Sequence, residues 1–288
     1  MRRYALCALL LPLTLPSARA DLLGTAASFA VLAGSTVTNT GPTTIGGDLG
    51  VSPGTAVSGF PPGIVSGTIH EADAVAGTAQ TDLTTVYNTL AGLPFNENLT
   101  GQDLGGLTLL PGVYSFSSSA QLTGTLTLNA QGNNNALWVF EIGTTLTTAS
   151  SSVVQIINGG ADEGLFWQVG SSATLGTGTA FEGNILAAQS ITLDTGAIIP
   201  CGRALAENAA VTLDTNVIST ACTATPGWSA SQASELGGGA MGVGLSSPAD
   251  NFVSDYSPSP IPEPSGVLLF ATCIAGLALQ RKWWLRAR

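Results

Sequence analysis

The chain has 288 residues, of which 9% are charged and 36 are glycine. Seven of its eight basic residues lie at the two ends, so residues 21–264 carry one arginine, all 18 carboxylates and a formal charge of −17. Phosphate groups are bound by cationic surfaces, so the strong negative charge of residues 21–264 excludes nucleic acid and anionic membrane surfaces as partners of that segment. Many glycines and β-branched residues with few aromatics favour a repetitive β-protein.

The N-terminal segment, 1–20, has the order of a secretory signal. Arg2 and Arg3 precede an apolar run, residues 4–15, and Ala18-Arg19-Ala20 is a cleavage site of the A-x-A type. The alternative is a short membrane anchor, but the run is short and broken by proline. We therefore expect a mature chain that starts at Asp21.

Residues 22–69 alternate between strand-like runs and turns. Strands are expected at 29–32, 36–39, 45–51 and 64–69, separated by glycine and proline, and together they predict first coils and a cap.

A helix follows over residues 71–91. Val75, Ala79, Leu83, Val86 and Leu90 have the spacing of one helical face, and Gly92 with Pro94 ends the pattern. We expect this helix to pack along the outside of the strands.

From Leu104 to Ser219 the strand pattern returns. Strands are expected at 104–110, 112–116, 122–128, 137–142, 153–157 and 165–169. The run 137–143 resembles the run 165–170, and the long offset between the two indicates a coil with an inserted loop.

One five-residue phrase then occurs three times, at residues 173–177, 191–195 and 211–215. A period near 20 with alternating apolar and polar residues is typical of stacked coils. If each coil lies on the next, Thr174, Thr192 and Thr212 form a column with a spacing of about 4.8 Å.

Cys201 and Cys222 are separated by about one coil, which would stack them one rung apart. That spacing suits a disulfide in a compartment that permits one. A redox pair is disfavoured because there is no Cys-x-x-Cys, and a metal site because His70 is the only histidine.

The C-terminal part consists of a linker and a targeting segment. Residues 226–261 are rich in Gly, Ser and Pro and predict a flexible linker. Three parts follow in a fixed order: Pro262-Glu263-Pro264, an apolar run over 266–279 that predicts a short membrane-spanning segment, and a basic cluster. This arrangement resembles the PEP-CTERM sorting signal of Gram-negative bacteria, which implies processing by an exosortase and release or retention outside the cell. A plain tail anchor is the alternative.

Several segments carry a further family likeness, in order along residues 22–222. The segments are 29–42, 47–54, 59–63, 166–173, 183–187 and 202–206. They resemble the ice-binding-like adhesins and antifreeze proteins of bacteria, fungi and algae. The resemblance implies a right-handed, three-sided parallel β-helix with a long helix alongside, over residues 21–225, and ice binding in many members.

Two sets of threonines are candidates for an ice-binding face. The first is the column Thr174, Thr192 and Thr212, whose outward neighbours include Asp194 and Asp214. The second lies past the bend of each coil and contains Thr177, Thr179, Thr195 and Thr215, in a partial match to the Thr-Gly/Ala-x-Thr/Asn pattern of the family. Threonine suits such a face because it is stiff at χ1. Alternatively, these threonines are ordinary strand formers or an internal ladder.

Other functional classes have weaker support. An enzyme of this fold would need clustered carboxylates with a basic partner, whereas the body offers only Arg203 and His70, far apart in sequence. Asp162-Glu163 or the pair Asp194 and Asp214 could bind Ca²⁺, at low ligand density. A surface or biofilm-matrix protein without ice activity is the main alternative. We expect a monomer that needs no cofactor or metal and whose partner is ice or ordered water.

Overall fold

The computed structural model describes residues 22–159 and 164–222. The signal, linker, Pro-Glu-Pro and membrane-segment predictions, together with Asp162 and Glu163, lie outside these ranges. Within the described part of the chain, no helix is long and apolar enough to cross a membrane.

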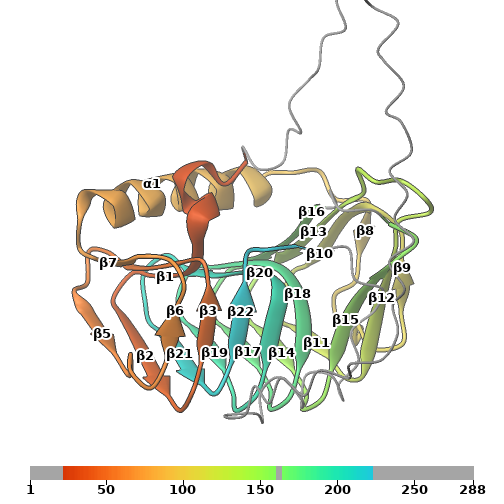
Figure 1. Cartoon of the computed structure of the whole chain (residues 1–288). Coiled ribbons are helices and arrows are strands. Elements are labelled where there is room, and N and C mark those ends of the chain that lie inside the picture. Colours follow the sequence, from red (N-terminus) through yellow and green to blue (C-terminus); the bar gives the residue numbers. More distant parts are fainter. Residues whose placement is uncertain (1–21, 160–163, 223–288) are drawn as a thin grey trace, which may run out of the picture. The chain divides into compact units, whose positions relative to one another are not determined.

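The described residues form parallel strands in two sheets, with one α-helix (Figure 1). This confirms the expected class of fold, mainly β with parallel sheets and a single long helix. The smaller sheet has seven strands in the order β11 (Ala120–Leu122), β14 (Leu146–Thr148), β17 (Ala173–Leu175), β19 (Ile191–Leu193), β21 (Val211–Asp214), β2 (Thr36–Thr40) and β5 (Ala56–Ser58).

The larger sheet has fifteen strands and contains two runs of pairing. The helix-side run is β7 (Ile69–Glu71), β4 (Asp48–Val51), β1 (Phe29–Ala33), β20 (Ile198–Ala206), β18 (Ala180–Ala187), β16 (Gly164–Val169), β13 (Leu137–Ile142), β10 (Gly112–Phe116) and β8 (Glu97–Asn98). The opposite run is β6 (Ile64–Val65), β3 (Thr44–Gly46), β22 (Val217–Ser219), the starts of β20 and β18, β15 (Val153–Ile157), β12 (Thr125–Asn129) and β9 (Thr108–Leu109). The long strands β18 and β20 therefore join the two runs.

The order of the stack differs from the order of the chain. β2 pairs with β21, and β1 pairs with β20, so the N-terminal coil lies on the last coil. Figure 1 shows the orange strands of the N-terminal part beside the cyan strands near residue 215, with the yellow and green strands beyond. After the helix, the chain thus begins again at the far end and winds back to meet its own start.

Helix α1 covers Ala74–Leu90 on the helix-side run. Asp73 caps it, because its Oδ1 accepts a hydrogen bond from the backbone N–H of Ala76 at 2.9 Å. The predicted start at residue 71 was too early, since Glu71 ends β7 and Ala72 has a φ of +49°. The predicted apolar face was also wrong at one position: Val75 is 48% exposed, and Ala76 is buried in its place.

Some expected strands are shorter or divided. The predicted strand 45–51 is interrupted at Gly47 (φ +154°), and the strand 122–128 at Gly124 (φ +90°). A left-handed φ suits glycine and breaks a strand at little cost. The expected strand 64–69 is two separate strands, and only residues 108–109 of 104–110 pair. Strands 137–142 and 153–157 have the predicted bounds, and the two similar runs lie side by side, with Trp138 paired to Leu165.

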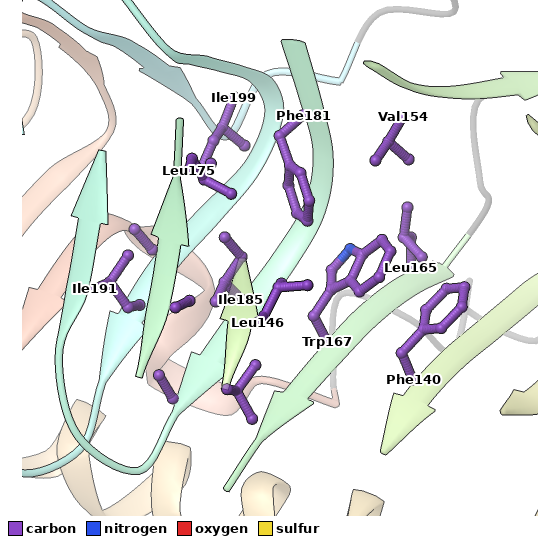
Figure 2. Packing of buried hydrophobic residues seen from close by; sticks show 14 of the residues in the cluster. Phe140, Leu146, Val154, Leu165, Trp167, Leu175, Phe181, Ile185, Ile191 and Ile199 are labelled. Carbon is purple, nitrogen blue, oxygen red and sulfur yellow. The ribbon is translucent and has the colours of Figure 1, made fainter. Parts of the chain in front are cut away.

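The interior is filled from all three runs of strands. Its aromatic part is a stack in which the Trp167 ring lies 4.0 Å from that of Phe140 and 4.9 Å from that of Phe181 (Figure 2). The expected disulfide is present: Cys201 and Cys222 are bonded, with their Cα atoms 4.6 Å apart. It fastens the chain beyond β22 to β20.

Candidate functional site

The outward side of the seven-stranded sheet carries an unbroken row of polar, mostly hydroxyl-bearing residues. In the six strands from β11 to β2 the residues on either side of the row are buried, as Ile191 and Leu193 are around Thr192. The paired positions, in the order of the stack, are Gln121, Thr147, Thr174, Thr192, Thr212, Thr38 and Ser58. We call this set the threonine row. Its six inter-strand spacings give a length of about 29 Å.

All members of the threonine row reach the surface. Thr174 and Thr192 are partly exposed, and the other five positions are exposed. Threonine at every one of five consecutive positions places a methyl group and a hydroxyl group at a regular interval. The parallel hydrogen-bonded ladder beneath fixes that interval.

A second line of small residues flanks the row on its N-terminal side. Ser172 and Ser190 lie on neighbouring rungs, and the Ser190 Oγ donates to the Ser172 Oγ at 2.9 Å. Thr36 occupies the equivalent position in β2 and pairs with Ala56. The surface beside the row is therefore also uncharged and rich in hydroxyl groups.

Carboxylates lie along the opposite border. Asp214 pairs with Thr40, two residues along the strands from the threonine row. Thr195 and Thr215 both donate their hydroxyls to the Asp214 carboxylate, the second at 3.1 Å. Two of the threonines predicted past the bend thus hold a carboxylate at the border of the row.

The other two threonines of that second set differ from each other. Thr179 is fully buried, and its hydroxyl lies 2.8 Å from the Thr148 hydroxyl and 3.2 Å from the Ala149 carbonyl. Thr179 therefore belongs to the interior, as expected if it were part of an internal ladder rather than of an ice-binding face. Thr177 is exposed in the turn between β17 and β18. The second set therefore forms a corner, whereas the first set lies on paired strands.

The sequence analysis identified three members of the threonine row and missed four. Thr147 could have been found by applying the offset between the two similar runs, which pairs Trp138 with Leu165, to Thr174. Thr38 could not have been found in this way, because no local sequence pattern indicates that the N-terminal coil stacks on the last one.

The side chains considered for other chemistry have structural contacts. His70 Nδ1 lies 2.6 Å from Asp73 Oδ2, and its ring packs 5.4 Å from that of Phe29. Arg203 donates to the Ala27 carbonyl, from Nε at 3.0 Å, and to Asn184 Oδ1 at 2.8 Å. It thereby ties β20 to the 3₁₀ turn η1 (Gly24–Ser28). Among the described residues, no three His, Cys, Asp or Glu side chains are grouped as metal ligands.

A stack of parallel strands with one flanking helix and a regular, hydroxyl-bearing outer surface defines a repeat protein built to present an extended face. Residues 31–219 match the Ice-binding-like family, and the chain belongs to this family. The ice-binding protein of Nostoc sp. (strain HG1) is 63% identical over 210 residues, which cover 73% of this chain and 78% of that protein. The ice-binding protein of Flavobacterium frigoris (strain PS1) is 33% identical over 211 residues, 68% and 75% of the two chains.

Solved structures agree with this assignment. The crystal structure of an ice-binding protein from the Antarctic ascomycete Antarctomyces psychrotrophicus superposes with a TM-score of 0.67 at 41% identity. The match covers 70% of this chain and 98% of that one. The ice-binding protein from an Arctic yeast gives a TM-score of 0.64 at 30% identity, over 72% of this chain and 98% of that chain.

Proposed function

We propose that this protein binds ice through the threonine row and the uncharged surface beside it. The observation that carries the proposal is the unbroken register of polar, mostly hydroxyl-bearing side chains across seven paired strands, in a chain of the Ice-binding-like family. Its relatives in Nostoc and Flavobacterium frigoris are named ice-binding proteins.

The physical reason is that binding a crystal of water requires a surface already ordered at a regular spacing. A hydrogen-bonded parallel ladder holds the Cα atoms of the row in place, and a β-branched side chain has few rotamers to lose. A preorganised surface lowers the entropy cost of binding. Methyl groups exclude disordered water while hydroxyl groups bind ordered water.

Of the two candidate sets, the first is favoured. Thr174, Thr192 and Thr212 lie on paired strands and reach solvent, and Thr147 and Thr38 extend them. In the second set, Thr179 is buried, and Thr195 and Thr215 donate to a carboxylate. A corner of this kind offers less regular surface than a strand row.

We infer that the strands wind as a right-handed, three-sided solenoid. Each full coil contributes one strand to the seven-stranded sheet and one to each of the two runs of the larger sheet, which supports three sides. Connections between parallel strands of one sheet are right-handed in about 98% of cases, which supports the hand.

We propose that the protein acts outside the cell as a monomer and without catalysis. The N-terminal signal and the Pro262-Glu263-Pro264 segment support export, with an exosortase as processing partner and a Gram-negative source. The Cys201–Cys222 disulfide fits an oxidising compartment.

The direct test is thermal hysteresis and inhibition of ice recrystallisation by the purified protein, with circular dichroism to verify folding. Faceted ice crystals and inhibited recrystallisation at micromolar protein are expected. A folded protein that leaves ice growth unchanged would refute ice binding and favour the surface or matrix scaffold.

A further inference from the structure

A second row of side chains faces outward on the opposite run of the larger sheet, and it is apolar. Val153, Ala180, Ile198 and Val217 pair in register on β15, β18, β20 and β22. Their strand neighbours Val154, Phe181, Ile199 and Ile218 belong to the main core. Because side chains alternate along a strand, the first set points away from that core. We call it the aliphatic row.

The aliphatic row is shielded even though it points outward. Ile198 is 0%, Ala180 1% and Val153 7% exposed. Thr192, with neighbours on both sides in its own row, remains partly exposed, so lateral neighbours alone do not hide an outward side chain. In the same run, Thr44, two coils further along from Ile198, is exposed, and Ile64, three coils along, is 65% exposed. The shield thus ends between Val217 and Thr44.

The chain leaves the solenoid next to this row. The disulfide holds Cys222 to Cys201, which lies three residues along β20 from Ile198. The described chain ends at Cys222, and the sequence continues from Thr223 to Arg288. Whatever follows Cys222 therefore starts from a point that is fixed to β20 three residues along from Ile198.

The following segment has suitable composition and reach. Residues 223–234 are uncharged, and Trp228 is the first large apolar residue among them. Six extended residues reach about 20 Å. The aliphatic row spans three strand spacings, or about 14 Å. Trp228 can accordingly contact any position from Val217 to Val153.

We propose that the aliphatic row is a docking surface for residues 223–236 of the same chain, with the Trp228 indole as its anchor. Docking covers the apolar side of the solenoid and leaves the threonine row as the open extended face. The linker predicted for residues 226–261 then begins only after Leu236. The proposal does not depend on ice binding.

The test compares Trp228→Ser with Trp284→Ser in the full chain, since each removes one indole. Loss of the anchor should lower the Tm by about 4 °C or more and raise the fluorescence of the apolar probe ANS. Trp284→Ser should change neither. Unchanged Tm and ANS fluorescence in Trp228→Ser would overturn the proposal.

Two further measurements complete the test. In a double-mutant cycle, Trp228→Ser and Ile198→Ala should lower the Tm by less together than the sum of their separate effects, because they remove the same contact. Additive effects would contradict docking at Ile198. Light scattering tests the other possible occupant, a second copy of the chain. A dimeric mass in the wild type, together with an unchanged Tm in Trp228→Ser, would assign the aliphatic row to that second copy and refute intramolecular docking.

Discussion

The position of Thr38 in the threonine row gives the sharpest functional prediction. Thr38 lies far from Thr212 in sequence but pairs with it directly, and it is the sixth of seven positions. A tyrosine at one position stands above the surface and blocks contact at that position and at its two neighbours, which are about 4.8 Å away. The length of row left uninterrupted then depends on where the tyrosine is placed.

The structure sets the order of the effects. Thr192→Tyr blocks the fourth position and leaves at most two consecutive members, whereas Thr38→Tyr leaves four, from Gln121 to Thr192. Ice activity should therefore fall most for Thr192→Tyr and less for Thr38→Tyr. Thr195→Tyr, at the corner, should remain close to wild type.

Thermal hysteresis at equal protein concentration measures this order. Because Thr192 and Thr38 face outward from strands and tyrosine is favourable there, these two variants should keep their stability within about 0.5 kcal/mol. Circular dichroism verifies that Thr195→Tyr, which changes the hydrogen bond to Asp214, is folded. An equal loss in Thr195→Tyr and Thr192→Tyr would refute the choice of surface. Full activity in Thr38→Tyr would show that the N-terminal coil is not part of the face.

Three predictions concern stability. Replacing Cys201 and Cys222 by serine opens a loop of about 22 residues, so unfolding should cost about 3 kcal/mol less and the Tm should fall by about 6–12 °C, whereas an unchanged Tm in non-reducing buffer would contradict a bonded pair. Trp167→Ala removes the middle of the aromatic stack and should cost about 3–5 kcal/mol in urea unfolding; a loss below about 1 kcal/mol would argue against this packing. Hydrogen bonds from the Thr25 hydroxyl and N–H lower the pKa of Asp82, so its contribution is present at neutral pH and is lost as the pH falls through the folded-state pKa. Asp82→Ala should lower the Tm by about 1–3 °C at pH 7 and not at all below that pKa, and a difference that persists in acid would contradict this origin.

Local pattern was enough to predict much of the fold. The alternation in residues 137–142 and 153–157 gave strands with the observed bounds, and the spacing of Leu83, Val86 and Leu90 located the buried face of α1. These features depend on neighbouring residues, so they are visible in a single sequence. The start of α1 was predicted too early because nothing in the residue pattern separates β7 and the left-handed Ala72 from the helix that follows them.

The order of the stack could not be predicted in this way. The period of the repeated phrase states that one coil lies on the next, but the contact of β2 with β21 joins coils that are not consecutive. Nothing in Val37-Thr38-Asn39-Thr40 specifies which strand it will meet. The first of the two candidate sets was consequently predicted as three threonines, whereas the paired row contains five, with Gln121 and Ser58 at its ends.

This non-local contact sets the length of the threonine row. The strands from β11 to β21 supply five positions of the threonine row, and β2 and β5 supply the remaining two. Arg203 on β20 holds the Ala27 carbonyl in the segment that leads into β1, and β1 pairs with the same strand. The one arginine of residues 21–264 therefore secures the coil that extends the row from five positions to seven. A substitution that loosens this attachment, such as Arg203→Met, should shorten the usable face even though the residue lies away from it.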